Sequence, residues 1–524
     1  MRNKNRRRKI GLTKKRYGFS RRQFLKACIA GAALCLPLKW GTRPAYAQIP
    51  GGTLAPGDVN KYVLPLIKPP AMPAHISNRN KDIYKIGVRQ FSQQILSPAH
   101  PMTTVWSYGS INHPGTVAEG GTFNYPAFTV EAGWDKTTQV LWRNELVDAM
   151  GNYLPHLLPV DQTLHWANPP GGLAGRDMRG FDPTPYTGPV PIITHVHGAH
   201  SDEDSDGYPE AWYLPDANNI PAGYARTGTF FDYFNNKYGH NWSPGTVSFK
   251  YQNDQPATTL WYHDHALGMT RLNVYAGPAG FWLIRGGPND TDLGYLAPGV
   301  GDDPFGEYTE IPIVIQDRSF NADGSLFYPD NRAFFEGLAP SELQIPFIPD
   351  IACDGLPSDV PPIWNPEFFG NMMVVNGRTW PYLEVEQTRY RFRFLNGCDS
   401  RFLILRMSND MPFYQIGSDE GFLPEPVQLT SLLIGPAERA DVIVDFSNLS
   451  VNTEITLLNL GPDEPFGGGI PGVDFDPADP SSTGQVMQFR IKGNNNLPIG
   501  QLPTVLPAAL PLGMEDNTRS VSLN

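Results

Sequence analysis

Two short segments of the sequence place histidines two residues apart, His195-Val196-His197 and His263-Asp264-His265. With 11 histidines among 524 residues, fewer than one such pair is expected by chance. Each pair lies at or just beyond the end of a segment with the composition of a strand. Side chains two residues apart on a strand project from the same face, so each pair can direct two imidazole rings to one point. Four imidazoles that converge in this way would suit copper, zinc or iron.

The alternative is that these are ordinary loop and core histidines that form hydrogen bonds, which a single pair would favour more than two pairs do. His200 lies in a polar loop and is expected to be solvated. The remaining histidines are scattered along the chain and receive no assignment: His75, His100, His113, His156, His165 and His240.

The segments that must position the two pairs are short strands joined by many turns. Glycine and proline number 52 each, aromatic residues make up 12% and charged residues 18%, which suits β domains better than helical bundles. The expected strands include, in a first series, 138–142, 190–194, 246–251, 258–263 and 280–285, and in a second series 310–316, 372–376, 388–395, 402–407, 431–434 and 440–446. Stretches 168–187 and 461–484, rich in Gly, Pro and Asp, are predicted loops. Two strand-rich blocks of similar length predict two sandwiches or barrels packed together.

The first 47 residues differ in charge from the rest of the chain. They hold 14 of the 41 basic residues and no Asp or Glu, which leaves 27 basic against 52 acidic residues and a net charge of −25 for the remainder. Such an acidic body is repelled by nucleic acid and anionic lipid, so neither is an expected partner. No apolar run of 18 residues is present, so no membrane-spanning helix is expected.

The basic N-terminus has the features of an export signal. The segment Ser20-Arg21-Arg22-Gln23-Phe24-Leu25-Lys26 is a twin-arginine signature, and a short apolar stretch and the small-residue site Ala45-Tyr46-Ala47 follow it. A basic disordered arm, the alternative, would need neither. The sequence therefore predicts a signal peptide over 1–47 and a periplasmic or extracellular protein. Cys353 and Cys398 would remain after cleavage, either as a disulfide or as two separate buried thiols.

Several motifs resemble the bilirubin-oxidase and spore-coat-laccase branch of the multicopper oxidases. In the first block they are His195-Val-His-Gly, Ser205-Asp-Gly-Tyr-Pro-Glu-Ala-Trp212, Trp261-Tyr-His-Asp-His265 and Arg271-Leu-Asn-Val-Tyr-Ala-Gly-Pro278. In the second they are Val375-Asn-Gly-Arg378, Arg391-Phe-Arg-Phe-Leu-Asn396 and Ile434-Gly-Pro-Ala-Glu-Arg-Ala-Asp-Val442. The resemblance runs from about residue 80 to the end.

The resemblance implies an all-β chain of cupredoxin-like Greek-key domains that couples oxidation of a small reductant to reduction of dioxygen to water. By the same resemblance His195 would be a type 2 copper ligand, while His197, His263 and His265 would bind the type 3 copper pair. Asp206 matches an acidic residue that assists proton delivery; an ordinary Asp-Gly turn is the alternative. The implied domains are the signal peptide 1–47, a lead-in 48–80, cupredoxin domains at 81–290 and 300–493, and 494–524 as a linker with the first strand of a third domain.

The sequence also departs from this family. No histidine follows His265, and neither Cys353 nor Cys398 has a histidine next to it, so half of the oxygen-site ligands and the type 1 copper site are missing from these 524 residues. Because Arg519–Leu523 resembles the opening strand of the absent domain, the expectation is a truncated or split oxidase that is inactive alone and is completed by a separate chain. The alternative is a non-enzymatic periplasmic scaffold or copper-holding protein.

Overall fold

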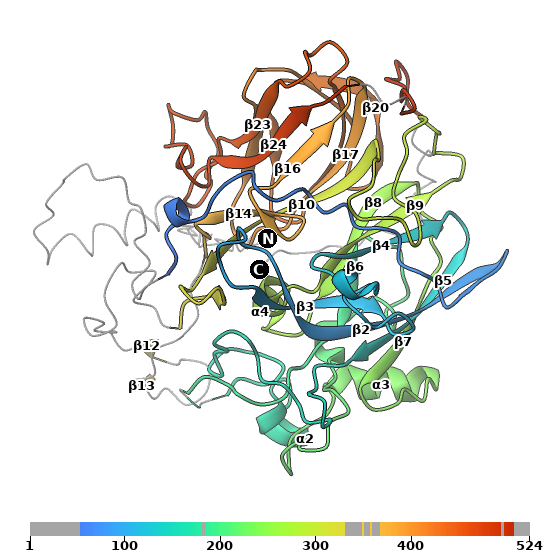
Figure 1. Ribbon diagram of the computed structural model, residues 1–524. Helices are drawn as coiled ribbons and strands as arrows, with labels where there is room; N and C mark the ends of the chain where they lie inside the picture. Colours follow the sequence, from blue (N-terminus) through green and yellow to red (C-terminus); the bar gives the residue numbers. More distant parts are fainter. Residues whose placement is uncertain are drawn as a thin grey trace, which may run out of the picture. The chain divides into compact units, whose positions relative to one another are not determined.

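The computed structural model describes residues 53–180, 182, 184–330, 367–493 and 497–507, and the backbone of 348–349 and 357–358. All described residues belong to one compact unit (Figure 1). The expected signal peptide, Cys353 and the strand-like end at 519–523 lie outside the described residues. Among the described residues, no helix has the length and apolar character needed to cross a membrane.

The first strand-rich block contains two sheets. One has the order β1-β2-β5-β7 with β3 paired to β2, and the other has the order β4-β9-β8-β6. The strands of the first sheet are β1 (Ile76–Ser77), β2 (Lys81–Gln93), β3 (Thr103–Ser110), β5 (Thr137–Asn144) and β7 (Thr246–Tyr251). Those of the second are β4 (Ala127–Gly133), β6 (Thr194–His197), β8 (Thr258–Asp264) and β9 (Ala279–Arg285). The α-helices of this block are α2 (Gly172–Gly175), α3 (Thr229–Tyr238) and α4 (Thr270–Ala276).

The second block contains an eight-stranded and a five-stranded sheet. The larger has the order β15-β14-β10-β17-β22-β19-β20 with β11 paired to β10, and the smaller has the order β16-β24-β23-β18-β21. The larger consists of β10 (Glu310–Phe320), β11 (Leu326–Phe327), β14 (Met372–Val375), β15 (Arg378–Thr379), β17 (Arg389–Asn396), β19 (Phe413–Ser418), β20 (Gly421–Leu429) and β22 (Arg439–Asp445). The smaller consists of β16 (Tyr382–Val385), β18 (Leu403–Met407), β21 (Leu432–Ile434), β23 (Glu454–Asn459) and β24 (Gln485–Ile491). Short strands β12 (Ile348–Pro349) and β13 (Pro357–Ser358) pair with each other.

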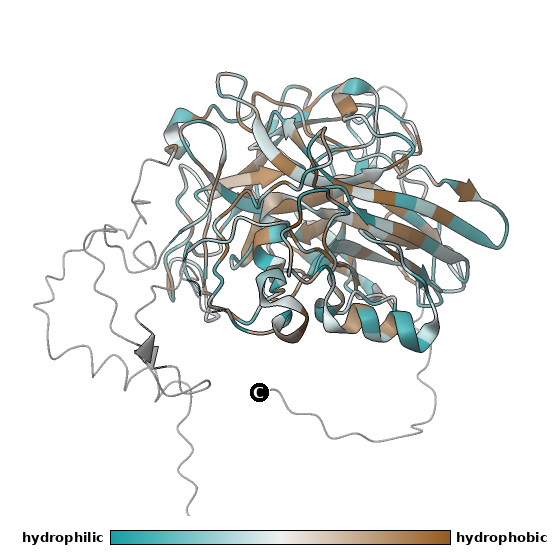
Figure 2. Ribbon diagram, turned by 90° about the horizontal axis from the view of Figure 1, so that it is seen from below, coloured by the Kyte–Doolittle hydropathy of each residue, from teal (hydrophilic) through white to brown (hydrophobic). Residues whose placement is uncertain are grey.

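The burial of each strand follows its place in the fold. Strand β5 alternates between buried and partly exposed residues, as expected of a strand with one face toward water. Strand β8 is buried along its whole length, because both faces of its sheet are covered. On one face Trp261 and Phe281 pack with Val314 and Leu395 of the second block. Figure 2 shows the hydrophobic residues concentrated in the strands.

The all-β expectation is confirmed: the described residues form four larger sheets in two strand-rich blocks, and the β12–β13 pair is a fifth, two-stranded sheet. The cupredoxin domain boundaries at 81–290 and 300–493 stay a prediction, since both blocks belong to one compact unit. The expected strand at 190–194 is wrong, because the strand begins at Thr194 and continues to His197. Pro191 cannot donate to a strand ladder, and Ile192 instead forms an isolated bridge with Tyr213.

Candidate metal centre

The two histidine pairs lie on neighbouring antiparallel strands. Strand β6 pairs with β8 in a register that sets His195 opposite His263 and His197 opposite Trp261. Strand β6 ends at His197, because Gly198 turns the chain with a φ of +86°. Strand β8 ends one residue before His265, whose backbone N–H still donates to Ile193 O at 2.7 Å. This hydrogen bond extends the ladder far enough to bring the fourth histidine to the same place.

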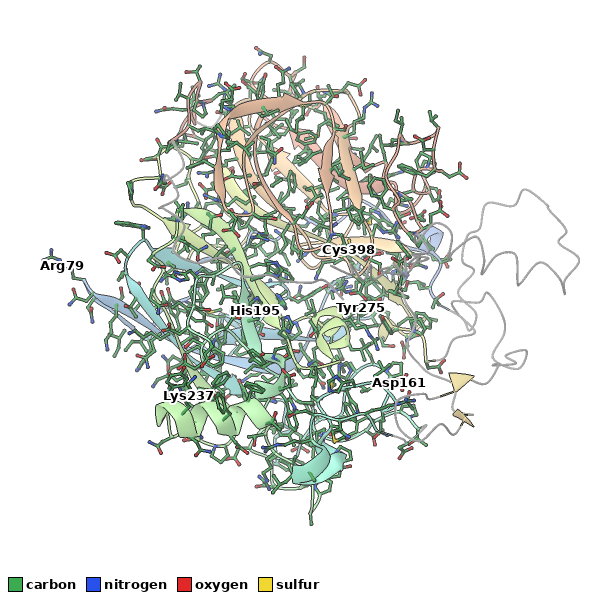
Figure 3. The ribbon with its side chains drawn as sticks, turned by 180° about the vertical axis from the view of Figure 1, so that it is seen from behind. Arg79, Asp161, His195, Lys237, Tyr275 and Cys398 are labelled. Carbon is green, nitrogen blue, oxygen red and sulfur yellow. The ribbon has the colours of Figure 1, made fainter. Side chains whose placement is uncertain are left out.

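All four predicted histidines come together. The ring centroid of His195 lies 5.8 Å from that of His197, 5.5 Å from that of His263 and 5.3 Å from that of His265. His263 lies 5.7 Å from His197 and 5.6 Å from His265 by the same measure. One ring nitrogen each of His195, His197 and His263 lies within 4.8 Å of the other two. Figure 3 labels His195 among the strands of the first block.

Hydrogen bonds fix which ring nitrogen of two histidines is available. The Nδ1 of His195 is 2.5 Å from Asp206 O, and the Nδ1 of His263 is 2.7 Å from Asp264 O. A carbonyl oxygen only accepts, so each Nδ1 carries the proton and each Nε2 keeps its lone pair. This is the arrangement of a metal-binding histidine whose other nitrogen is held by the backbone.

Two nitrogens of the cluster are buried without a partner, namely Nε2 of His263 and Nδ1 of His265. A buried polar atom with no hydrogen bond is unfavourable, and an ion held by His195, His197 and His263 would satisfy the nitrogen of His263. Burial lowers the pKa of His197 to about 4, with a contribution from the Arg439 charge, and lowers the pKa of His263 well below its ordinary value. Both rings are therefore neutral at pH 7, as metal ligation requires.

Asp206 lies beside the cluster and within a tight turn, so both interpretations of its sequence have structural support. Its carbonyl holds His195, while its carboxylate accepts from Ser201 Oγ at 3.0 Å and lies 3.5 Å from His195 Nδ1. Gly207 follows with a φ of +80°, and a Cβ there would lie 2.2 Å from Thr194 O. The turn needs glycine for this close approach to β6. A role of the half-exposed carboxylate in proton transfer stays a prediction.

Sequence reasoning missed Asp264, the residue between the histidines of the second pair. Its buried carboxylate accepts from the backbone of Ile193 and Ala266 and from Asn273 Nδ2, all within 3.0 Å. It therefore joins the start of β6, the chain beyond β8 and helix α4. Burial raises the pKa of Asp264 to about 7. The sequence signal for this role was its place between two ligand candidates.

His156 extends this network, since its Nε2 lies 3.0 Å from Asn273 Oδ1. The other histidines do not join the cluster. His200 is exposed and pairs with Asp254, in agreement with the prediction of a solvated side chain. Cys398 is a buried free cysteine in the second block. Cys353 lies outside the described residues, so the choice between a disulfide and two separate thiols stays a prediction.

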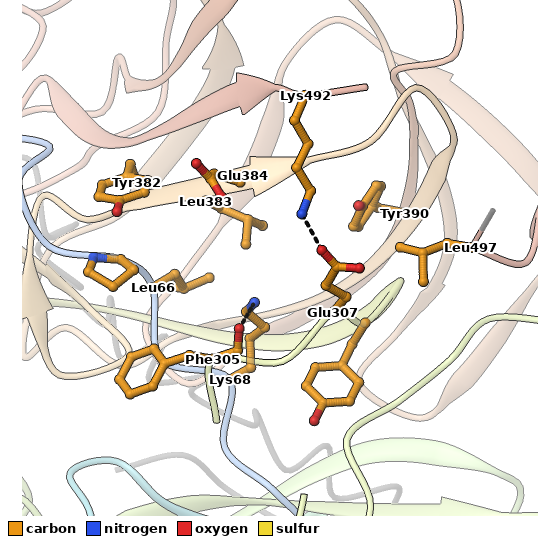
Figure 4. Close-up of a pocket in the computed structure, with 12 residues that line it drawn as sticks. Leu66, Lys68, Phe305, Glu307, Tyr382, Leu383, Glu384, Tyr390, Lys492 and Leu497 are labelled. Carbon is orange, nitrogen blue, oxygen red and sulfur yellow. Dashed lines mark hydrogen bonds and ion pairs between the residues drawn. The ribbon is translucent and has the colours of Figure 1, made fainter. Parts of the chain in front are cut away.

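A separate cavity of about 150 Å³ lies against the second block (Figure 4). Lys68 Nζ donates to Gly306 O at 2.6 Å, and Lys492 pairs with Glu307. Burial lowers the pKa of Lys68 to about 8, and the Lys492 charge adds to this effect. None of the four clustered histidines lines this cavity, so it is not part of the metal centre. Both of its lysines already have partners.

Known proteins resemble this chain in sequence and in fold. A laccase of Bacillus stratosphericus is 33% identical over 471 residues, which cover 89% of this chain and 73% of that protein. A laccase of Bacillus subtilis strain 168 is 32% identical over 433 residues, 83% of this chain and 66% of the relative. The crystal structure of a Pediococcus acidilactici laccase has a TM-score of 0.52 at 20% identity and covers 88% of this chain and 68% of that one. No family model matches the chain.

A chain with two β blocks, a converging histidine cluster and this identity belongs to the multicopper oxidase family, in its bacterial laccase branch. The chain spans about two thirds to three quarters of the two Bacillus laccases. Plant relatives are covered less, as in the 59% of multicopper oxidase LPR1 homolog 3 of Oryza sativa at 34% identity.

Proposed function

We propose that His195, His197, His263 and His265 bind copper and form one part of the oxygen-reducing centre of a laccase-like multicopper oxidase. The observation that carries this proposal is the convergence of ring nitrogens of His195, His197 and His263, with the His265 ring next to them and two buried nitrogens that have no hydrogen-bond partner among the described residues. Imidazole also suits zinc and iron. Copper is favoured because the relatives are named laccases and multicopper oxidases.

Each residue has a defined part in this proposal. His195 is the type 2 ligand, and His197, His263 and His265 serve the type 3 pair. Asp264 and the carbonyl of Asp206 orient the rings through the backbone, and the Asp206 carboxylate is placed to pass protons to the centre. Copper, when bound, supplies the one-electron steps that couple oxidation of a small reductant to reduction of dioxygen to water.

The proposal requires ligands from beyond these residues. No histidine follows His265, and neither cysteine of the second block has a histidine beside it in sequence. The remaining cluster ligands and the site that collects electrons must come from a further domain or from a separate chain. We therefore expect residues 1–524 to bind copper and to show no turnover by themselves.

The test is to load the purified chain with Cu(II) and measure bound copper and oxygen uptake with a phenolic donor. His263→Ala should lose copper, while His200→Ala, which changes an exposed histidine outside the cluster, should retain it. Sustained oxygen uptake by the chain alone would contradict the expected incompleteness. Equal copper content in His263→Ala and the parent would contradict the site itself.

A non-enzymatic role on the same scaffold is the second candidate. The observation that favours it is that, within these 524 residues, neither Cys353 nor Cys398 has a neighbouring histidine and no histidine follows His265, whereas a type 1 copper site needs one thiolate and two imidazoles. A periplasmic scaffold would contain negligible copper and keep its cellular function in His263→Ala. Stoichiometric copper would favour the oxidase.

Export by the twin-arginine pathway is also part of the proposal. It rests on Arg21, Arg22 and the Ala45-Tyr46-Ala47 site, which lie outside the described residues. Replacing both arginines by lysine should retain the precursor in the cytoplasm. Cell fractionation with mass determination of the mature N-terminus tests both the route and the cleavage site.

A further inference from the structure

Strand β6 stops before strand β8 does, and this leaves part of β8 without a backbone neighbour. The register sets His197 opposite Trp261, so two further residues would place residue 199 opposite Thr259. Ala199 instead turns away and donates to Val196 O at 3.1 Å. Because His265 N–H donates toward β6, alternation along an antiparallel strand directs the backbone groups of Thr259 to the same side. The carbonyl of Thr259 therefore faces the space that β6 has left.

A guanidinium group from the second block fills this space. Arg439, the first residue of β22, donates from Nε to Thr259 O at 2.9 Å. Its Nη1 donates to Ala437 O at 3.0 Å and lies 3.2 Å from the Asp419 carboxylate, while Nη2 donates to Asp419 O at 3.0 Å. The side chain is only 2% exposed. All three nitrogens are thus engaged, a geometry that a lysine cannot reproduce.

The same guanidinium lies against the end of the first histidine pair. A Cβ added to Gly198 would meet Arg439 Nη2 at 3.1 Å and Leu260 Cδ2 at 3.1 Å. On β8, the residue two positions after Thr259 is Trp261, whose ring stacks on His263 at 4.1 Å and on His197 at 5.4 Å. Arg439 therefore lies against β8 and against the residue that follows β6, close to the indole ring that stacks on two candidate ligands.

We propose that Arg439 is a positioning residue of the metal centre, through which the second block holds Thr259 of β8 and Gly198 after β6 in place. The inference rests on the proposed copper site and adds a requirement to it. The geometry of the centre depends on a residue from a block that supplies no ligand. Arg439 touches no metal and takes no part in the chemistry.

The test compares Cu(II) affinity and the electron paramagnetic resonance spectrum of bound Cu(II) in the full chain and its variants. Arg439→Lys should weaken Cu(II) binding about 10- to 100-fold, as loss of residues that orient metal ligands usually does, and should change the copper hyperfine splitting. Arg401→Lys is the matched control, since Arg401 is a buried arginine of the same block whose partners are Asp317, Asp463, Pro462 and Gly370. It should lower the melting temperature and leave the affinity and spectrum unchanged.

A second pair of variants covers the case in which Arg439→Lys does not fold. Gly198→Ala would press on the guanidinium, while Gly223→Ala carries a similar φ of +89° and meets nothing within 4 Å. Gly198→Ala should alter the copper spectrum and Gly223→Ala should not. Parental affinity and spectrum in Arg439→Lys, or in Gly198→Ala, would overturn the inference while the proposed function stood. A parent chain that binds no copper would refute the proposed function and the inference with it.

Discussion

His195 and His263 face each other across the β6–β8 pair, with ring centroids 5.5 Å apart and each Nδ1 held by a backbone carbonyl. The two rings come from segments separated by more than 60 residues, yet the register of one pair of strands fixes their relation. A slip of one residue would move every side chain of β6 to the opposite face. The spacing of the candidate ligands is therefore a property of the sheet.

This relation predicts that His195 and His263 act as one unit. His195→Ala and His263→Ala should each weaken Cu(II) binding by at least tenfold, and the double variant should lose less than the two single losses combined. The reason is that either change removes a ligand of the same centre, so effects on neighbours that share a partner are not additive. The Cu(II) affinities of the parent, the two single variants and the double variant form a double-mutant cycle. Competition titration with a chelator of known affinity measures them. Full additivity would mean that the two rings belong to independent sites and not to one copper centre.

Gly207 should be essential for the position of His195. Gly207→Ala brings a Cβ to 2.2 Å from Thr194 O at a φ of +80°, so the turn must move and carry the Asp206 carbonyl away from His195. We expect a loss of about 1–3 kcal/mol in the free energy of unfolding, from strain at this backbone conformation, together with weaker copper binding. Gly301→Ala is the control, because its φ of +78° imposes a similar backbone strain while the added Cβ meets nothing within 4 Å. A difference between the two variants therefore reports the contact with Thr194. Identical copper affinity in both variants would contradict the role of the turn.

The clustering of the four histidines was predictable from the sequence because its signal is local. Two histidines at a spacing of two residues share a face of a strand whatever the rest of the chain does, and the structure brings all four together. Asp264 and Arg439 gave no comparable signal. Arg439 lies 180 residues from Thr259, the residue whose carbonyl it binds, and only the packing of two sheets brings them together.

Strand positions were likewise predictable where the local pattern decides them, and were not where pairing with a distant strand decides them. Residues 246–251 carry a clear pattern, and the predicted strand coincides with β7. The segment 190–194 is equally apolar, but Pro191 interrupts its ladder and the strand forms later, at Thr194–His197. There the pairing with β8 decides where the strand lies.

Glu310 should make stability depend on acid pH. Three arginines surround it, Arg285, Arg391 and Arg393, and their charges hold the pKa of this buried carboxyl well below its usual range. A lowered pKa in the folded state means that the stabilisation is present above the ordinary pKa of about 4.3 and is lost as the pH falls below it. Glu310→Gln should cost about 3–5 kcal/mol at pH 7, since it removes the carboxylate that the three arginines share and leaves them only Glu131 and Asp441 as acidic partners. Urea unfolding at pH 7 and pH 3 should show a difference between variant and parent that is smaller at pH 3 by about 2 kcal/mol, because the stabilisation is only partly lost until the pH reaches the lowered pKa.

His156 should give a second pH dependence, in a higher range. Burial lowers the pKa of this ring to about 4, and its nitrogens bind the side chain of Asn273 and the backbone N–H of Leu158. The unfolded chain takes up a proton near pH 6.5 and the folded chain does not, so stability falls as the pH drops from about 6.5 to 4, by up to about 3 kcal/mol. His156→Gln, which cannot titrate, should flatten the stability curve in this range. Chemical unfolding of the metal-free chain between pH 7 and pH 4 measures it, because bound copper would add its own proton competition. A parallel curve for His156→Gln and the parent would show that His156 is charged in the folded chain or that another group controls the slope.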